Sequence, residues 1–184
     1  MIKLALPVIF IFLLGCIAKK NCQKPRFTKH TIEENHHRSD LREIEILVSD
    51  TMCFQFFFPE SSLECGTNQI NNILGFSNSI DPRFSSGRVG WRCTDSSGFD
   101  IYANVTQESR SLMQKMLRVH PNDTVSAKVI DTSKSWIIEV ECKGESRSVS
   151  LPKFYGTFYN WRLNPYYGKK KPSKDIAIYI LEEP

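Results

Sequence analysis

Apolar and polar side chains alternate along several short stretches of the chain, a pattern typical of strands that bury one face. The clearest case runs from Phe99 to Val105, where Phe99, Ile101, Ala103 and Val105 share one face. Short apolar runs bounded by turn residues indicate strands elsewhere in the same way. Seven further strands are predicted, at Ile44–Val48, Cys53–Phe58, Val89–Cys93, Thr124–Ile130, Trp136–Cys142, Val149–Leu151 and Ile176–Leu181.

Two stretches show the helical period instead. Glu108–Val119 carries an apolar stripe and is followed by a proline, so it is predicted to be the best helix of the chain. The stripe consists of Leu112, Met113, Met116 and Leu117. A shorter helix is predicted over Thr67–Leu74, with Thr67 as its N-cap.

The order of these elements predicts an α+β domain, mostly antiparallel sheet, with one or two short helices. Long helices do not alternate with strands, which disfavours a doubly wound parallel sheet. From Val89 to Cys142 the order is strand, turn, strand, helix, strand, turn, strand. That order resembles the later part of a small OB-type barrel, in which a helix separates the third and fourth strands. Gly75–Arg88 is predicted to be a long loop, and loops of that length are often functional.

The N-terminus carries the pattern of an export signal. Lys3 precedes an apolar run from Leu4 to Leu14, which is too short to cross a hydrocarbon core of about 30 Å as a helix. A signal peptide over residues 1–18 could be cut after Ala18. Alternatively, the four residues ending at Cys16 resemble the lipobox of bacterial lipoproteins, in which the cysteine is lipidated. Both readings place the mature protein outside the cytoplasm, either secreted or anchored by lipid.

Residues 19–40 are polar and show no period, so they are predicted to be a tether in front of a single domain over residues 41–184. His30, His36 and His37 lie in this tether and lack the i, i+4 spacing of helical metal ligands. We therefore expect solvated histidines and no metal site there, and nothing in the sequence indicates a cofactor.

The cysteines of the predicted domain are expected to form disulfides rather than a zinc site. Export would place the cysteines in an oxidising compartment, and at least eleven residues separate consecutive domain cysteines, too many for a zinc site. Signal removal takes Cys16 away, and Cys22 in the tether is the candidate for the odd thiol. The predicted disulfides are Cys93 with Cys142 and Cys53 with Cys65.

Catalytic chemistry has little support in the sequence. His120 is the only histidine of the predicted domain, and no G-x-S-x-G motif is present, so no catalytic residue is assigned. Loop carboxylates keep a small secreted hydrolase open as an alternative function. The candidates are Asp81, Asp95, Asp100 and Asp131. The leading hypothesis is a non-catalytic binding or envelope module, and a formal charge of only +4 gives no reason to expect nucleic acid as its partner.

An aromatic stretch followed by lysines is the most unusual part of the chain. Aromatic rings beside cations can stack on ligand rings and neutralise anions, so any macromolecular partner is expected to be an anionic or glycan-bearing surface. The other interpretation is an aromatic mini-core under a loop, with the lysines as a solvated turn that needs no partner. A membrane would be contacted only through the lipid anchor. The residues assigned to this site are Trp161, Tyr166, Tyr167, Lys169, Lys170 and Lys171. Asn104 and Asn122 begin N-glycosylation sequons, which matter only in a eukaryotic host.

Overall fold

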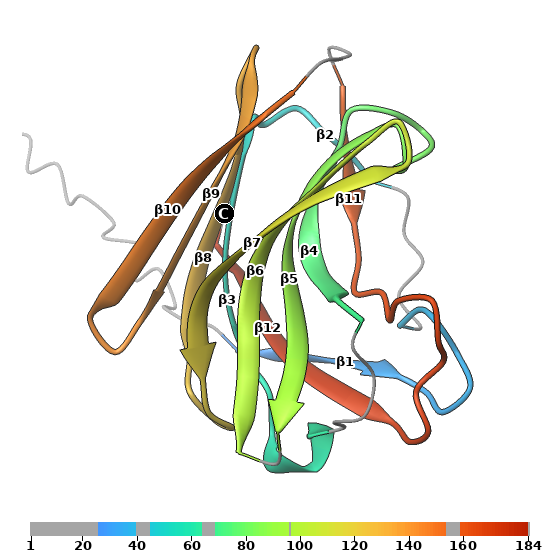
Figure 1. The fold of residues 1–184 in the computed structure, drawn as a ribbon, viewed down its shortest axis with the longest axis vertical. Coiled ribbons are helices and arrows are strands. Elements are labelled where there is room, and N and C mark those ends of the chain that lie inside the picture. Colours follow the sequence, from blue (N-terminus) through green and yellow to red (C-terminus); the bar gives the residue numbers. More distant parts are fainter. Residues whose placement is uncertain (1–25, 40–44, 64–68, 96, 154–158, 184) are drawn as a thin grey trace, which may run out of the picture.

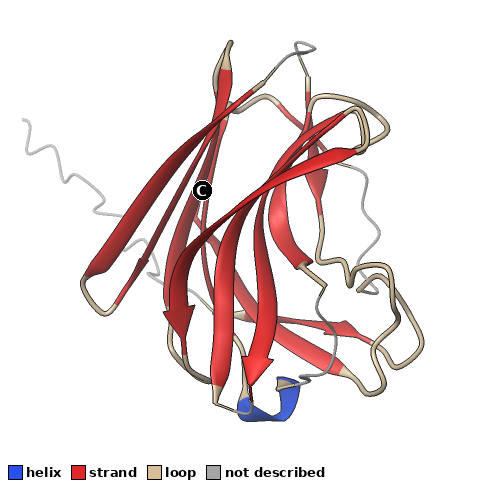
Figure 2. Cartoon of the chain, viewed as in Figure 1, coloured by secondary structure: helices blue, strands red, loops and turns tan. Residues whose placement is uncertain are grey.

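The computed structural model describes residues 26–39, 45–63, 69–95, 97–153 and 159–183. These residues form two antiparallel six-stranded sheets that pack face to face as a β-sandwich (Figures 1 and 2). The only helical element among them is a 3₁₀ turn, η1 (Glu60–Ser62). None of the described helical structure is long and apolar enough to cross a membrane.

The first sheet has the strand order β1-β12-β3-β8-β9-β10 and the second has the order β2-β11-β4-β5-β6-β7. The strands of the first sheet are β1 (Thr28–Ile32), β12 (Ile176–Glu183), β3 (Thr51–Phe57), β8 (Val125–Asp131), β9 (Ser135–Cys142) and β10 (Glu145–Pro152). Those of the second are β2 (Ile46–Leu47), β11 (Asn160–Leu163), β4 (Asn71–Ser77), β5 (Ser85–Asp95), β6 (Gly98–Gln107) and β7 (Arg110–Val119).

The core lies between the two sheets and is rich in aromatic rings. Phe54 and Phe56 of β3 point inward on alternate positions, and Phe58 follows them. The ring of Phe58 contacts two rings of the second sheet, Trp91 at 4.8 Å and Phe99 at 4.4 Å between centroids. Fully burying one such side chain contributes about 1.5–3 kcal/mol, so this aromatic layer is a major part of what holds the sheets together.

The predicted helix over Glu108–Val119 is wrong, because Arg110–Val119 is strand β7, paired along its length with β6. The cause is a β-bulge. Ile101 lies opposite Leu117 while Tyr102 lies opposite Lys115, so Met116 is an extra residue. Met116 and Leu117 are therefore both buried although they are neighbours, which imitates a helical stripe. Half of the stripe is solvated, since Met113 is 53% exposed.

The predicted fold class, α+β, is accordingly wrong: the described chain is nearly all β. The second predicted helix is also replaced by a strand, because Asn71–Ser77 is β4, while Thr67 lies outside the described residues. The OB-like barrel is wrong as well, since the strands form two sheets of six rather than one small closed barrel. The seven predicted strands other than Ile44–Val48 correspond to β3, β5, β6, β8, β9, β10 and β12.

Three boundaries also differ from the sequence-based expectation. Part of the predicted tether is strand β1, which pairs with β12 and buries His30 and Ile32. Half of the predicted Gly75–Arg88 loop is strand, and only residues 78–84 connect β4 to β5. Of the predicted strand at Ile44–Val48, only the short exposed edge strand β2 is found among the described residues. The predicted signal peptide lies outside the described residues.

Neither predicted disulfide is present, because Cys53 and Cys142 are free thiols. Cys93 belongs to the second sheet and Cys142 to the first. Cys53 alternates with the buried Met52 and Phe54, so it points away from the core. Cys93 itself is disulfide-bonded, but no disulfide joins two described cysteines.

Candidate functional site

The outward face of the second sheet forms a groove of about 1220 Å³. Strands β4, β5, β6 and β7 supply its floor, and β11 supplies one side. The loop between β4 and β5 contributes residues 79–83 to its wall, and the segment after β11 contributes residues 164–166. Arg38 and Ser39 reach it from the chain that follows β1.

Three rows of directly paired residues cross this floor, because partners opposite each other in a sheet point to the same face. The central row is Leu163, Gly75, Arg88, Asn104 and Met113. The rows on either side are Trp161, Ser77, Ser86, Thr106 and Ser111, and Tyr166, Asn72, Gly90, Tyr102 and Lys115. The register thus brings one arginine to the middle of a floor of amides, hydroxyls and aromatic rings.

Gly75 allows Arg88 to occupy that central position. A Cβ atom on residue 75 would lie 2.1 Å from the carbonyl oxygen of Gly87 and 3.0 Å from Cγ of Arg88. Any side chain there would displace backbone of β5. A bulge in β4 between Asn72 and Gly75 keeps both of these residues on the groove face.

Positive charge dominates the described lining of the groove. Its acidic member is Asp81, and its cationic members are Arg38, Arg83, Arg88, Arg92, Arg162 and Lys169. Arg83 is paired with Asp81 at 2.7 Å, and its hydrogen bonds lower the pKa of that carboxyl to about 2.

Two more arginines of the lining have carboxylate partners. Arg162 is paired with Glu45 and Glu182, and Arg92 lies 3.7 Å from the buried carboxylate of Asp100. The remaining cations, Arg38, Arg88 and Lys169, have no carboxylate partner among the described residues.

Arg88 is the cation held deepest in the groove. Its Nε atom is inaccessible to solvent and makes no hydrogen bond within the described structure. Burial lowers the pKa of the Arg88 guanidinium to about 10; the charge of Arg38 pushes the pKa further down, and Tyr166 opposes the shift. Two cations that repel each other without a counter-ion make this end of the floor a strong anion-attracting position.

Polar amides and aromatic rings surround the two arginines. Asn104 donates from Nδ2 to Oδ1 of Asn72 at 2.7 Å, while its own Oδ1 is buried without a hydrogen-bond donor. Tyr166 stacks on the imidazole of His37, with 5.8 Å between ring centroids. Trp161 lines the groove from β11. The groove therefore brings together aromatic rings, side-chain amides and cations that have no carboxylate partner among the described residues.

The sequence-predicted ligand residues divide between groove, core and solvent. Trp161, Tyr166 and Lys169 line the groove. Tyr167 is fully buried and packs edge-on against Trp91 at 5.9 Å, so its ring belongs to the core. The side chains of Lys170 and Lys171 are exposed and lie outside the described lining.

The sequon residues also fall in different places. Asn104 is only 7% exposed on the groove floor, where a glycan could not be attached without breaking its contacts. Asn122 lies in the turn after β7 with φ of 65°.

The four loop acids that could serve a hydrolase are not brought together. Asp81 is held by Arg83, Asp95 by Arg118, and Asp100 by Arg92 and Lys115. Asp131 lies apart from these three, in a buried ion pair with Lys153. In the part of the chain that the structure describes, no three His, Cys, Asp or Glu side chains gather as a metal site.

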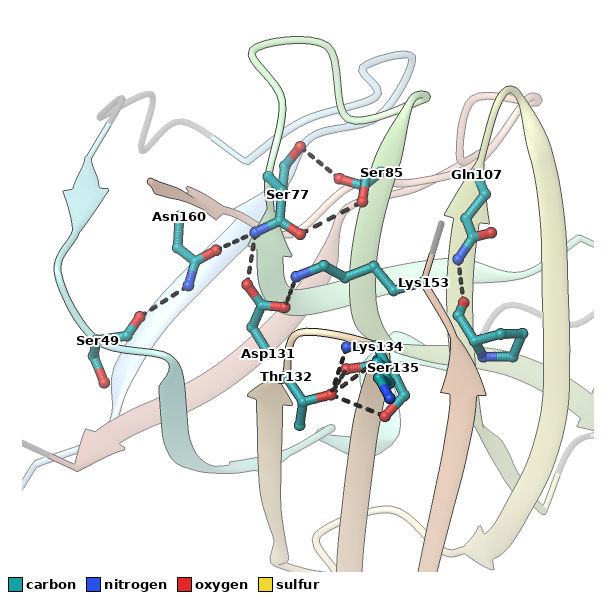
Figure 3. A network of polar contacts seen from close by, with 12 residues as sticks. Ser49, Ser77, Ser85, Gln107, Asp131, Thr132, Lys134, Ser135, Lys153 and Asn160 are labelled. Atoms are coloured by element: carbon teal, nitrogen blue, oxygen red, sulfur yellow. Dashed lines mark hydrogen bonds and ion pairs between the residues drawn. The ribbon is translucent and has the colours of Figure 1, made fainter. Parts of the chain in front are cut away.

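Asp131 and Lys153 form a buried ion pair at one end of the sandwich (Figure 3). Asn78 of the β4–β5 connection donates to the other oxygen of Asp131 at 2.7 Å and to Asn160 at 2.5 Å. Asn160 in turn donates to the carbonyl of Ser49 at 3.0 Å. The network ties Asp131 and Lys153 of the first sheet to Asn78 and Asn160 of the second, so its role is structural.

Sequence reasoning missed Arg38 and Arg88, although one signal for Arg88 was present. Arg88 and Arg92 alternate with Val89, Trp91 and Cys93, which predicts that both arginines point away from the core. No pattern in the sequence indicates that the outward face of this strand is a groove rather than open surface.

Comparison with known proteins gives a fold and no family. No family model matches the chain, and no curated protein matches it. Among solved structures, it is similar to a functionally unknown protein from Saccharomyces cerevisiae, with a TM-score of 0.51 and 13% identity over 89% of this chain and 91% of that one. It is also similar to part of the xylan β-1,4-xylosidase of Bacillus halodurans C-125, with a TM-score of 0.53 and 7% identity over 86% of this chain. The chain matches only 33% of the xylosidase's length, and at these identities both likenesses show the β-sandwich fold alone.

Proposed function

We propose that this protein is an exported, non-catalytic binding module that holds an extended saccharide in the groove of its second sheet. The observation that carries the proposal is the groove itself, about 1220 Å³ in volume and lined across five strands by aromatic, amide and hydroxyl groups. Ligand sites in proteins combine apolar and aromatic walls with a few polar groups that fix orientation.

The chemistry of the lining favours a saccharide over an apolar ligand. Trp161 and Tyr166 offer flat faces against which the C–H face of a sugar ring can pack. Asn72, Asn104 and Thr106 offer donors and acceptors for sugar hydroxyls. An apolar ligand would leave these polar groups unpaired, which costs about 1–3 kcal/mol for each buried group.

Binding without catalysis is favoured by the charges in the groove. Glycoside hydrolysis ordinarily needs two carboxyl groups on either side of the scissile bond. Among the described lining residues Asp81 is the sole carboxylate, and its partner Arg83 lowers its pKa, which removes it as a proton donor near neutral pH.

Export rests on the N-terminal pattern of Lys3 followed by the apolar run to Leu14. Intact-mass measurement of the protein from its native host tests it. We expect loss of residues 1–18, or a mass that starts at Cys16 plus acyl chains. A cytoplasmic product that retains Met1–Ala18 would contradict export.

The binding proposal is tested with a panel of soluble oligosaccharides, neutral and acidic, titrated by calorimetry. Trp161→Ala and Tyr166→Ala should each weaken binding about tenfold, because each removes one stacking face. Tyr159→Ala is the matched control, since Tyr159 is 64% exposed and lies outside the described lining. Binding that all three variants retain, or no binding by the wild type to any oligosaccharide of the panel, would refute the proposal.

A further inference from the structure

We propose that Arg88 and Arg38 form a subsite for an acidic group of the ligand, a carboxylate or a sulfate ester. The saccharide part of this inference rests on the proposed function, and the anion subsite itself does not. It names the ligand class more closely, as an acidic oligosaccharide rather than a neutral one.

Arg88 lies at the centre of the groove floor. It is the central residue of the central row, with Gly75 on one side and Asn104 on the other. It reaches this place only because residue 75 has no side chain. A ligand lying along the groove would therefore pass over this guanidinium.

The charges of Arg88 and Arg38 are not neutralised by any described carboxylate. Arg88 has a buried Nε without a hydrogen bond, and neither it nor Arg38 has a carboxylate partner among the described residues. The other arginines of the described lining, Arg83, Arg92 and Arg162, are all paired with acids. An unpaired, partly desolvated cation destabilises the free protein, so an arrangement of this kind is explained by an anion that arrives with the ligand.

The shape of the guanidinium group determines which anions fit the subsite. A guanidinium presents its N–H groups in a planar fork that matches the oxygens of carboxylate and of sulfate or phosphate. The rest of the site favours a sugar that bears such a group, because Asn72, Asn104 and Thr106 line the groove with amide and hydroxyl groups and Trp161 adds an aromatic ring. Lys169, also on the groove wall, adds long-range attraction for the same sign of charge.

The first experiment compares acidic and neutral forms of one oligosaccharide. Galacturonate tetramers and their methyl esters are titrated into wild type, Arg88→Gln, Arg38→Gln and the control Arg147→Gln, which removes one exposed charge from the opposite sheet. We expect the wild type to bind the acid form more tightly, and Arg88→Gln to lose about tenfold to a hundredfold for the acid form only. A sulfated tetrasaccharide replaces the uronate in a parallel arm to separate carboxylate from sulfate.

The second experiment needs no saccharide. The thermal midpoint is measured in sodium sulfate and in sodium chloride of equal ionic strength, for wild type, Arg88→Gln and Arg147→Gln. A bound anion raises the midpoint, so sulfate should stabilise wild type and Arg147→Gln more than Arg88→Gln. In chloride alone, Arg88→Gln should melt at or above the wild-type temperature, because the substitution removes an uncompensated charge.

The outcomes separate the two proposals. Equal binding of acidic and neutral tetramers, unchanged by Arg88→Gln, would overturn the anion subsite and leave the saccharide groove standing. An Arg88-dependent effect of sulfate without oligosaccharide binding would support the subsite and refute the saccharide. A lower melting temperature of Arg88→Gln in chloride would show that Arg88 is structural and would overturn the inference. Tighter binding of single-stranded DNA than of the acidic tetramers would overturn the assignment to saccharides.

Discussion

Replacing Lys153 by methionine should cost this protein much of its stability. Lys153 and Asp131 form an ion pair with side chains only 5% and 9% exposed. The ammonium also lies 5.1 Å from the ring centroid of Trp136. Methionine keeps most of the volume of the lysine stem but removes the charge, so Asp131 would remain buried with the hydrogen bond from Asn78 at 2.7 Å and without its cation.

The expected loss of stability follows from the charge of Asp131, which stays buried after Lys153 is replaced. Removing one partner of a buried ion pair costs about 3–5 kcal/mol, because the other charge stays desolvated and uncompensated. Changing both residues, Lys153→Met with Asp131→Asn, leaves no buried charge and keeps an acceptor for Asn78. Such neutral replacements of a buried pair are often close to neutral in stability, so the double variant should fall within about 1 kcal/mol of wild type.

Urea unfolding followed by tryptophan fluorescence measures both effects. With a slope of about 2 kcal/mol per molar urea, Lys153→Met should lower the midpoint by about 2 M. Lys128→Met on the outward side of β8 is the control, and a half-exposed lysine without an ion pair should change stability by about 0.5 kcal/mol or less. If Lys153→Met stays within 1 kcal/mol of wild type, or if the double variant is no more stable than the single one, the reasoning about the buried pair is wrong.

Three further predictions concern other parts of the sandwich. Burial lowers the pKa of His30 from 6.5 to about 4, and the nearby charge of Arg162 has a smaller effect in the same direction. The folded protein therefore favours the neutral imidazole, so the free energy of unfolding should fall as the pH drops from 6.5 to 4. The full pKa shift corresponds to about 3 kcal/mol, and solvent screening at the sheet edge reduces the expected loss of stability to about 2 kcal/mol. In urea unfolding, His30→Gln should abolish this part of the pH profile. Alkylation of the native, unreduced protein should label Cys53 faster than the more buried Cys142, because burial raises the pKa of the Cys142 thiol. Peptide mapping that finds either cysteine in a disulfide would contradict the structure. Gly87→Ala should cost about 1–3 kcal/mol in urea unfolding, because the added Cβ would lie 2.6 Å from the indole of Trp136, and an unchanged midpoint would show that the core has room there.

The alternation of apolar and polar residues was sufficient to predict most strands of this protein. In β6, for example, Phe99, Ile101 and Ala103 bury one face as the sequence indicates. The pattern failed in β7, where the extra residue Met116 breaks the period of two. A bulge is set by the partner strand, so a period read along one strand does not reveal it. The α+β prediction was wrong mainly for this reason.

The candidate site needed the register as well as the strands. The sequence by itself placed Arg88 at the end of a predicted loop and assigned Trp161 and Tyr166 to an unusual aromatic stretch. Only the tertiary structure decided that these residues, more than seventy positions apart in the chain, line one groove, and that Tyr167 belongs to the core. The reason is physical: local periodicity fixes the face on which a side chain lies, whereas pairing between distant strands fixes its neighbours. Whether a cation finds a carboxylate depends on those neighbours, so the unpaired charge of Arg88 is a property of the fold.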